Sequence, residues 1–243
     1  MYKNHSILCV IPARGGSKGL PGKNIKKLSG KPLIAYSIEQ AKGAKYVDRI
    51  IVSTENREIA DIARRYGAEV PFMRPRELAT DDCSIIDVLL HAMDWMEKKG
   101  KCKFDILVLL HATAPLRTIE DIDNSIKLLV DKKADNVFSV AEAHRNPYFN
   151  MVEMRKDGTA GLVKKGSFVT RQSAPRVFDM NASIYVWWKD LLRKKKSVFL
   201  KKSRVYVMPR ERSVDIDDYL DFRIAEMLLK EKTDRGSSTN TVR

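Results

Sequence analysis

The most constraining feature of this sequence is a run of glycines and basic residues directly after a short apolar segment. The apolar segment, Ile7–Ile11, has the length and composition of a strand buried on both faces. The run Ile11–Lys26 reads IPARGGSKGLPGKNIK and interleaves glycines with cations. Glycine allows positive φ and close approach of backbone N–H groups to a ligand, and fixed cations strengthen such an anion nest. The run predicts a polyphosphate site, most simply for a nucleoside triphosphate; the alternative is a flexible basic turn.

The spacing of these glycines excludes two familiar nucleotide motifs. A Walker A loop, G-x-x-x-x-G-K-[ST], needs one residue more than the stretch from Gly15 to Gly19 provides, and the next residue is Leu20. The dinucleotide fingerprint G-x-G-x-x-G does not occur in the run either. ATPase and dinucleotide-binding functions therefore lose their main support.

Most of the chain alternates between apolar segments and segments of helical periodicity, which predicts an α/β fold with a mostly parallel sheet. The expected strands after the first are Arg49–Thr54, Glu69–Phe72, Phe104–Leu110 and Asp135–Val140, and the expected helices begin near Pro32, Asn56, Ser84 and Thr118. Ligands of such sheets bind beyond the carboxyl ends of the strands. The glycine-rich run, Ser53-Thr54 and His111–Arg117 all follow expected strands, so we expect them to share one site.

The regular alternation breaks in the insertion at about 143–180. Alternating residues at Met151–Met154, the turn Lys156-Asp157-Gly158 and the segment Gly161–Lys165 predict a β-hairpin that leaves the body. The chain then returns to regular structure through two expected strands and a last helix, namely Asn181–Trp187, Arg204–Met208 and Tyr219–Leu229. We predict a single domain over residues 1–232 and a disordered polar tail over 233–243.

Composition narrows the class of protein. A hydrophobic content of 44% suffices for a core, and no apolar run approaches the roughly 20 residues that span a bilayer. Without such a run we expect no membrane partner. The three cysteines lie far apart without metal-ligand spacing, so we expect a reduced, cytoplasmic setting. The net charge of +14 admits a basic nucleic-acid-binding protein without catalysis as the hypothesis from another class. No nucleic-acid-binding motif accompanies the charge, so we expect no nucleic-acid partner.

Two aspartates late in the chain could hold a metal ion. Asp215 and Asp217 alternate around Ile216, so both carboxylates face one way in an extended backbone. Paired carboxylates suit Mg²⁺ shared with phosphate oxygens. The alternative is that Asp217 or Asp218 simply caps the final helix.

These motifs together resemble those of sugar nucleotidyltransferases, in particular the acylneuraminate (CMP-sialic acid) cytidylyltransferase family, from roughly Ile7 to Glu226. The resemblance implies a Rossmann-like sheet of nucleotidyltransferase type with a β-hairpin dimerisation insertion. It also implies CTP and an acidic nine-carbon sugar as partners, Mg²⁺ as cofactor, and a homodimer or dimer of dimers. In this family the insertion lends residues to the neighbour's site.

The family pattern assigns nucleotide binding to the glycine-rich run and to the loop RPRELATDDCS, where relatives have R-P-x-x-L-A-x-D-x-x-S around cytosine. For that loop the alternative is a helix N-terminus capped by Asp82 or Ser84. The implied nucleotide-binding residues are Ala13, Arg14, Gly15, Lys23, Asn24, Arg74, Thr80 and Ser84.

The sugar-binding residues implied by the same resemblance are His111, Arg117, Arg171, Gln172, Asp179 and Asn181. Arg117 alternatively only anchors the helix that follows it. His111 departs from the glutamine typical of sialic-acid-activating relatives, and Asp179 stands where those relatives carry a second arginine. With the segments RQSAP and RNPYFN, these departures make the chain resemble bacterial enzymes that activate di-N-acetylated sugars such as legionaminic acid.

The function implied is transfer of CMP from CTP to the anomeric hydroxyl of a nonulosonic acid, with release of pyrophosphate. Arg14, Lys18 and Lys23 would stabilise charge on the phosphates. Asp217 would accept the hydroxyl proton, and Asp215 and Asp217 would hold the metal. The alternative within the class is a cytidylyltransferase for Kdo or another sugar acid.

Overall fold

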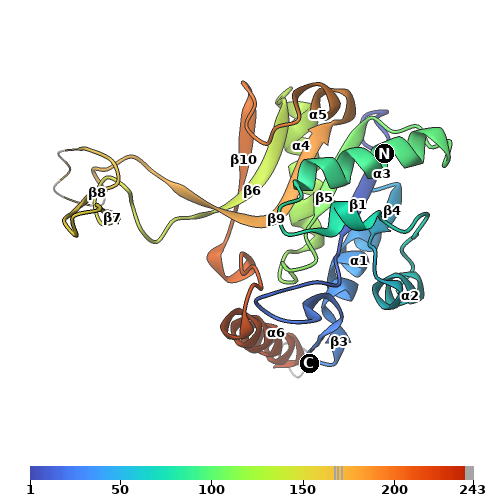
Figure 1. Cartoon of the computed structure of the whole chain (residues 1–243), viewed down its shortest axis with the longest axis horizontal. Helices are drawn as coiled ribbons and strands as arrows, with labels where there is room; N and C mark the ends of the chain where they lie inside the picture. Colours follow the sequence, from blue (N-terminus) through green and yellow to red (C-terminus); the bar gives the residue numbers. More distant parts are fainter. Residues whose placement is uncertain (167, 169, 171, 239–243) are drawn as a thin grey trace.

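The computed structural model of the chain describes residues 1–166, 168, 170 and 172–238. Its centre is a six-stranded sheet with the order β10-β6-β9-β5-β1-β4, and an arm projects from one side (Figure 1). β1 is parallel to β4 and β5, β10 is parallel to β6, and β9 runs antiparallel between β5 and β6. The strands are β1 Ile7–Pro12, β4 Arg49–Ser53, β5 Ile106–Leu110, β6 Asn136–Glu142, β9 Phe178–Trp188 and β10 Ser203–Met208. The predicted mostly parallel α/β sheet is confirmed.

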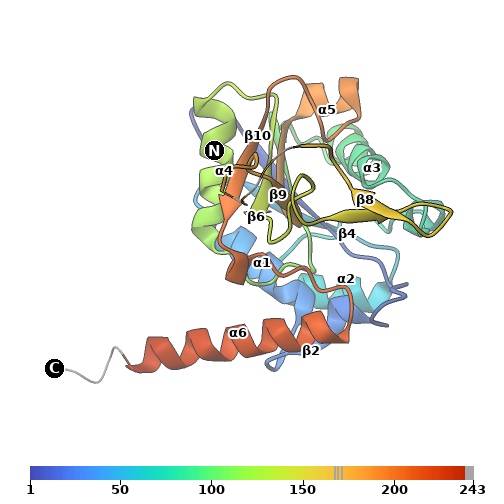
Figure 2. The same ribbon diagram turned by 90° about the vertical axis from the view of Figure 1, so that its left-hand side faces the viewer.

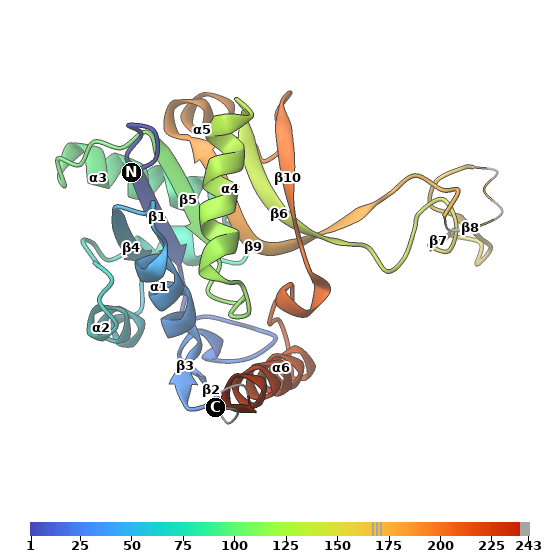
Figure 3. The ribbon, with the colours of Figure 1, turned by 180° about the vertical axis from the view of Figure 1, so that it is seen from behind.

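Helices cover both faces of the sheet because the interior strands are apolar on both sides. In β1, Ile7, Cys9 and Ile11 pack against α1, α2 and α4, whereas Leu8 and Val10 pack against α3 and α5 on the opposite face. Figures 1 and 3 show α3 over one face and α1 and α4 over the other. The helices are α1 Leu33–Gly43, α2 Arg57–Arg65, α3 Ile85–Lys98, α4 Ile119–Asp131 and α5 Lys189–Lys195.

A third, smaller apolar cluster fixes the last helix, α6 (Tyr219–Ser238), below the sheet. This cluster buries Leu20 of the glycine-rich run together with Ile216, from the segment before α6, and Phe222, from α6 itself. Figure 2 shows α6 lying along the lower edge of the body. The cluster therefore holds the segment before α6 against the glycine-rich run.

Two expectations from the sequence need correction. Glu69–Phe72 is not a strand, because the segment makes only an isolated bridge between Ile51 and Glu69. The backbone of residues 233–238, predicted to be a disordered tail, continues α6 as far as Ser238. Extending a helix that has already formed costs little, because each added residue gains one backbone hydrogen bond. Residues 239–243 lie outside the described part of the chain.

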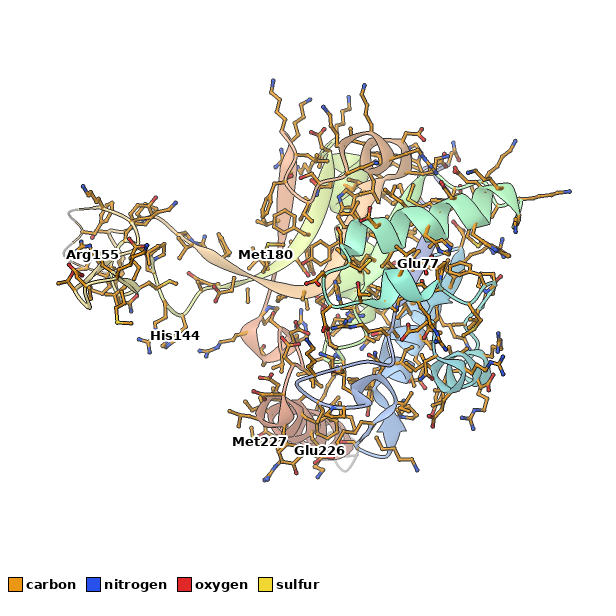
Figure 4. All side chains as sticks on the ribbon, in the orientation of Figure 1. Glu77, His144, Arg155, Met180, Glu226 and Met227 are labelled. Atoms are coloured by element: carbon orange, nitrogen blue, oxygen red, sulfur yellow. The ribbon has the colours of Figure 1, made fainter. Side chains whose placement is uncertain are left out.

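The arm contains the predicted hairpin. β7 (Val152–Met154) pairs antiparallel with β8 (Ala160–Leu162), and Gly158 supplies the positive φ of 83° in their turn. Arg155 lies in the distal part of the arm and Met180 at its neck (Figure 4). The remaining short elements are β2 Lys27–Leu28 and β3 Lys31–Pro32, with single 3₁₀ turns η1 Lys23–Ile25, η2 Arg76–Ala79 and η3 Arg210–Arg212.

Within the part of the chain that the structure describes, no helix is both long enough and apolar enough to cross a membrane.

Candidate functional site

A cavity of about 350 Å³ lies at the carboxyl ends of β1 and β5. Two of the three segments expected to share a site line it, namely the glycine-rich run and the segment that begins at His111. The third, Ser53-Thr54, is buried and is not among the lining residues. The lining of the cavity comes from the glycine-rich run, the loop before α3, the segment after β5, β9 and the segment before α6. The residues are Pro12, Arg14, Lys23, Asn24, Arg74, Leu78, Thr80, Asp81, Cys83, Ile85, Val88, His111, Ala112, Thr113, Ala182, Asp215 and Asp217.

The glycine-rich run is held in place by its own polar groups. Ala13 N–H donates to Ser53 O at 3.0 Å, and Asn24 Nδ2 donates to Arg14 O at 2.9 Å. At Gly19 a side chain would overlap the backbone carbonyl of Asp217, so glycine allows the run to approach the segment before α6. The close approach places cations and carboxylates in the same cavity.

Lys23 joins these two segments directly. Its Nζ donates to Ile216 O at 2.9 Å and to Asp217 Oδ1 at 3.0 Å. The Lys23 side chain is 15% exposed, whereas that of Asp217 is 77% exposed. Lys23 is thus the better-fixed partner, and the carboxylate of Asp217 remains accessible to a ligand.

The paired aspartates have the donor set for a divalent cation. Within the described residues, Asp215 Oδ1 is buried and lacks a hydrogen-bond partner. Burial raises the pKa of Asp215 above its ordinary value; Asp217 adds to the rise, while Thr113 and Lys23 oppose it. A cation would satisfy the orphaned oxygen and favour the ionised carboxylate. The described residues hold no cluster of three or more metal-ligating side chains, so the remaining ligands would come from phosphate and water.

In the segment before α6, the residue that caps the helix is Asp218. Its Oδ1 accepts hydrogen bonds from the N–H groups of Leu220 at 2.8 Å and Asp221 at 3.0 Å. Asp217 instead faces Lys23. The two neighbouring aspartates therefore have separate roles, one in the helix and one in the cavity.

Sequence reasoning missed Glu55, which links two predicted nucleotide segments. Its Oε1 accepts from Gly15 N–H at 2.6 Å, and its Oε2 accepts from Arg74 Nη2 at 3.0 Å. Arg74 is buried, and the pair is shielded on both sides. The available signal was position, because Glu55 follows Ser53-Thr54 at the carboxyl end of β4. Asp81, also missed, lies within the loop that the family pattern assigns to cytosine.

The loop before α3 combines binding and capping positions. Thr80 and Cys83 line the cavity, with the apolar side chains of Leu78 and Val88 nearby. Ser84, predicted to bind nucleotide, is the N-cap of α3, and its Oγ accepts from the N–H of Ile86 at 3.2 Å. The structure thus favours the capping alternative for Ser84.

His111 is a predicted sugar residue, and it lines the cavity together with residues predicted to bind the nucleotide. Its imidazole pKa falls to about 4, because burial disfavours the charged form and Arg117 and Lys23 repel it. The ring is therefore neutral at pH 7 and can accept as well as donate a hydrogen bond. Its carbonyl accepts from Ser37 Oγ at 3.1 Å and from the guanidinium of Arg117.

Two other predicted sugar residues lie in the core. Arg117 is 2% exposed and donates to Ser183 Oγ at 3.0 Å and Ser37 Oγ at 3.1 Å, which favours the anchoring alternative. Asn181 is buried and bonded to the Oγ atoms of Ser139 at 2.6 Å and Ser213 at 2.9 Å. Both side chains position the backbone beside the cavity.

Two further predicted sugar residues, Gln172 and Asp179, lie on the arm and at its neck. Gln172 lines a separate hollow at the arm's base, with Asn146 and Pro175. Asp179 is exposed on the first part of β9, opposite Ala141. The neighbouring Met180 marks this position at the neck (Figure 4). Arg171 lies outside the described residues.

Comparison with known families decides the class. The family model described as Cytidylyltransferase matches residues 8–231. The chain belongs to the cytidylyltransferase family. The resemblance to nucleotidyltransferases of the acylneuraminate cytidylyltransferase type is thereby confirmed, and it extends along nearly the whole described chain.

Several relatives align over almost their full length. The chain is 46% identical to post-translational flagellin modification protein B of Campylobacter coli. It is 44% identical to CMP-N,N'-diacetyllegionaminic acid synthase of Campylobacter jejuni. Each alignment covers 93% of this chain and 96% of the relative. A pseudaminic acid cytidylyltransferase of Campylobacter jejuni is 30% identical, with 92% and 96% covered.

A solved structure confirms the fold. A CMP:2-keto-3-deoxy-manno-octonic acid synthetase complexed with CTP superimposes with a TM-score of 0.70 over 93% of this chain and 99% of that one. At 18% identity the likeness extends to the architecture of the sheet and helices.

Proposed function

We propose that this chain transfers CMP from CTP to the anomeric hydroxyl of a nonulosonic acid and releases pyrophosphate. The observation that carries the proposal is the bond of Lys23 to Asp217, which unites the glycine-rich run and the paired aspartates in one cavity. Phosphate-binding groups and metal-binding groups within one cavity suit phosphoryl-type transfer, which depends mainly on positioning and charge stabilisation.

The chemistry would proceed by direct displacement. The anomeric oxygen forms a bond to the α-phosphorus, the bond from that phosphorus to the β-phosphate bridging oxygen breaks, and pyrophosphate carries away the electron pair. Arg14, Lys18 and Lys23 stabilise the negative charge on the phosphates and the leaving group. Asp217, exposed at the cavity, accepts the proton of the hydroxyl.

Mg²⁺ is the proposed cofactor, held by Asp215 and Asp217. The buried, unpartnered Oδ1 of Asp215 and the raised pKa of that carboxyl support this assignment. When bound, the ion would offset charge on the phosphate oxygens. The chain's own residues would orient the sugar and remove its proton.

The proposed sugar is an N,N'-diacetylated nonulosonic acid of the legionaminic type. Relatives named CMP-N,N'-diacetyllegionaminic acid synthase are 44% and 32% identical, compared with 30% for the pseudaminic acid enzyme. Pseudaminic acid is therefore the second candidate. The neutral imidazole of His111 is consistent with hydrogen bonding to an uncharged part of the sugar.

We further propose a homodimer, with a dimer of dimers as the larger form, in a cytoplasmic setting. The arm exposes Met151, Val152 and Met154, which a partner subunit would bury. Gln172 and Asp179 lie on the arm and its neck, from which they would serve the partner's cavity. The three free cysteines suit a reducing compartment.

Pyrophosphate release with CTP and Mg²⁺ tests the function across a panel of N-acetylneuraminate, N,N'-diacetyllegionaminate, pseudaminate and Kdo. The proposal expects release with a nonulosonate and the highest kcat/KM with the diacetyllegionaminate. Comparable turnover of N-acetylneuraminate and the diacetylated sugar would contradict the sugar assignment. Release with Kdo alone would overturn the nonulosonate class, and no release with any acidic sugar would overturn the transfer itself.

A further inference from the structure

Asp81 lies inside the nucleotide cavity and pairs with two cations of the glycine-rich run. Its Oδ1 is 2.7 Å from Arg14 Nη1, and its Oδ2 is 2.5 Å from Lys18 Nζ. Asp81 comes from the loop before α3, which is remote in sequence from both cations. One carboxylate therefore occupies the groups that the proposed function assigns to phosphate.

The geometry matches what an anionic ligand would do at the same place. Each oxygen of Asp81 takes one cation, as two oxygens of a phosphate would. Lys18 and then Arg14 lower the pKa of the Asp81 carboxyl below its ordinary value, so it is ionised at neutral pH. A polyphosphate that used both cations would have to replace this internal anion.

Exposure distinguishes the two ion pairs of Asp81 from the Glu55–Arg74 ion pair nearby. In the Glu55–Arg74 pair the side chains are only 17% and 4% exposed, which suits a lasting link between two loops. Around Asp81 the exposed fractions are 39% for Asp81, 35% for Arg14 and 84% for Lys18. Ion pairs this accessible contribute little and exchange partners readily.

The backbone around Asp81 also permits movement. Asp81 lies between η2 and the N-cap of α3, in a turn whose Cys83 N–H donates to Thr80 O at a long 3.4 Å. Asp81 could leave the cations without breaking a helix or strand.

We propose that Asp81 is an internal counter-anion that the phosphates displace on binding and that re-pairs with Arg14 and Lys18 when pyrophosphate leaves. The inference rests on the proposed function, because it requires a polyphosphate at these cations. Asp81 thus weakens the binding of the leaving product and favours its release. It acts as a positioning residue through Arg14 and Lys18.

Calorimetric binding of inorganic pyrophosphate and of CTP tests the inference. Asp81→Asn keeps the size of the side chain and removes the competing charge, so we expect both ligands to bind about two- to ten-fold more tightly. The gain should shrink at high salt, because the ion pairs are exposed. Asp82→Asn removes a charge from the same exposed loop and should bind pyrophosphate as the wild type does. Asp81→Glu retains the charge and should stay near the wild-type affinity.

Product inhibition supplies a kinetic readout that a purely structural role would not produce. The inhibition constant for pyrophosphate should fall in Asp81→Asn by the same factor as the dissociation constant. Unchanged or weaker pyrophosphate binding in Asp81→Asn, with wild-type thermal stability and a wild type that transfers CMP, would overturn this inference alone. A wild type that binds neither CTP nor pyrophosphate would overturn the proposed function with it.

Discussion

The part of the site proposed for the nucleotide (the nucleotide end) and the part proposed for the sugar (the sugar end) are built in different ways. At the nucleotide end, the glycine-rich run, the loop before α3 and the paired aspartates line one cavity of a single chain. At the sugar end, Gln172 and Asp179 lie on the arm and its neck, while Arg117 and Asn181 are buried in the core. His111 is the predicted sugar residue that links the two, because it lines the cavity from the end of β5.

The difference follows from how each end is positioned. Strands of a parallel sheet end at a common edge, so loops far apart in sequence converge there without special contacts. The arm leaves that sheet and rests on a neck, where Ala143 N–H donates to Val177 O at 3.1 Å. If the arm completes a site, it must pack against another subunit to do so. The following variants separate the two ends by their expected effects.

The largest effect should come from the carboxylate in the cavity. Asp217→Asn removes the proposed base and the partner of Lys23, so turnover should fall by about 10²–10⁴-fold. CTP binding should persist, because the cations of the glycine-rich run remain. Single-turnover CMP transfer and calorimetric CTP binding are the measurements.

The matched control for that variant is Asp218→Ala. It removes the cap of α6 and should cost about 1 kcal/mol of unfolding free energy, with turnover close to normal. Near-normal turnover in Asp217→Asn would remove this carboxylate from the mechanism.

A smaller effect is expected from the residue that joins the two ends. Burial holds the pKa of His111 near 4, below the ordinary 6.5, so the unfolded chain takes up a proton first as pH falls. The contribution of neutral His111 is complete above about pH 6.5 and is lost progressively toward pH 4. Between pH 7 and pH 5 the unfolding free energy of the wild type should therefore fall by about 1–2 kcal/mol more than that of His111→Gln, which lacks the titrating imidazole.

Chemical denaturation at the two pH values measures this difference. His144→Gln, which removes an exposed histidine from the arm, is the matched control. If the unfolding free energy had the same pH dependence in the wild type and in His111→Gln, the imidazole would be fully hydrated, and its placement in the cavity wall would be wrong.

The smallest effects are expected from two hydroxyl residues of the loop before α3, one assigned to helix capping and the other to ligand binding. Ser84→Ala removes the N-cap of α3 and should cost about 1 kcal/mol of unfolding free energy without changing CTP affinity. Thr80→Val, in the cavity lining, should weaken CTP binding with little loss of stability. If Ser84→Ala weakened CTP binding more than Thr80→Val did, the assignment of the two roles would be reversed.

The sequence predicts well those parts of the fold that depend only on neighbouring residues. The buried strand before the glycines, the caps at Asn56 and Thr118, and the hairpin turn at Gly158 were all predictable from neighbouring residues. The link between Glu55 and Arg74 was not, because it depends on which loops end side by side.

Buried polar residues were the least predictable part of the site. Arg117 and Asn181 carry the same chemistry whether they face a ligand or the core. Their roles depend on Ser37, Ser139 and Ser183, which lie far away in sequence. Near Asn181 a register shift in the β6–β9 pairing and the positive φ of 44° at Ala182 redirect side chains beside the cavity. The sequence carries no period that marks such a bulge.

Replacement of the arm tests most directly whether the two ends are separable. Residues 147–174 would be exchanged for a short glycine–serine linker between Asn146 and Pro175, which already lie together because Asn146 Nδ2 donates to Pro175 O at 2.9 Å. We expect the shortened chain to bind CTP with wild-type affinity and to lose CMP transfer by at least about 10²-fold, because the sugar is no longer positioned. Wild-type transfer by the shortened chain, or loss of CTP binding in a folded shortened chain, would contradict the account.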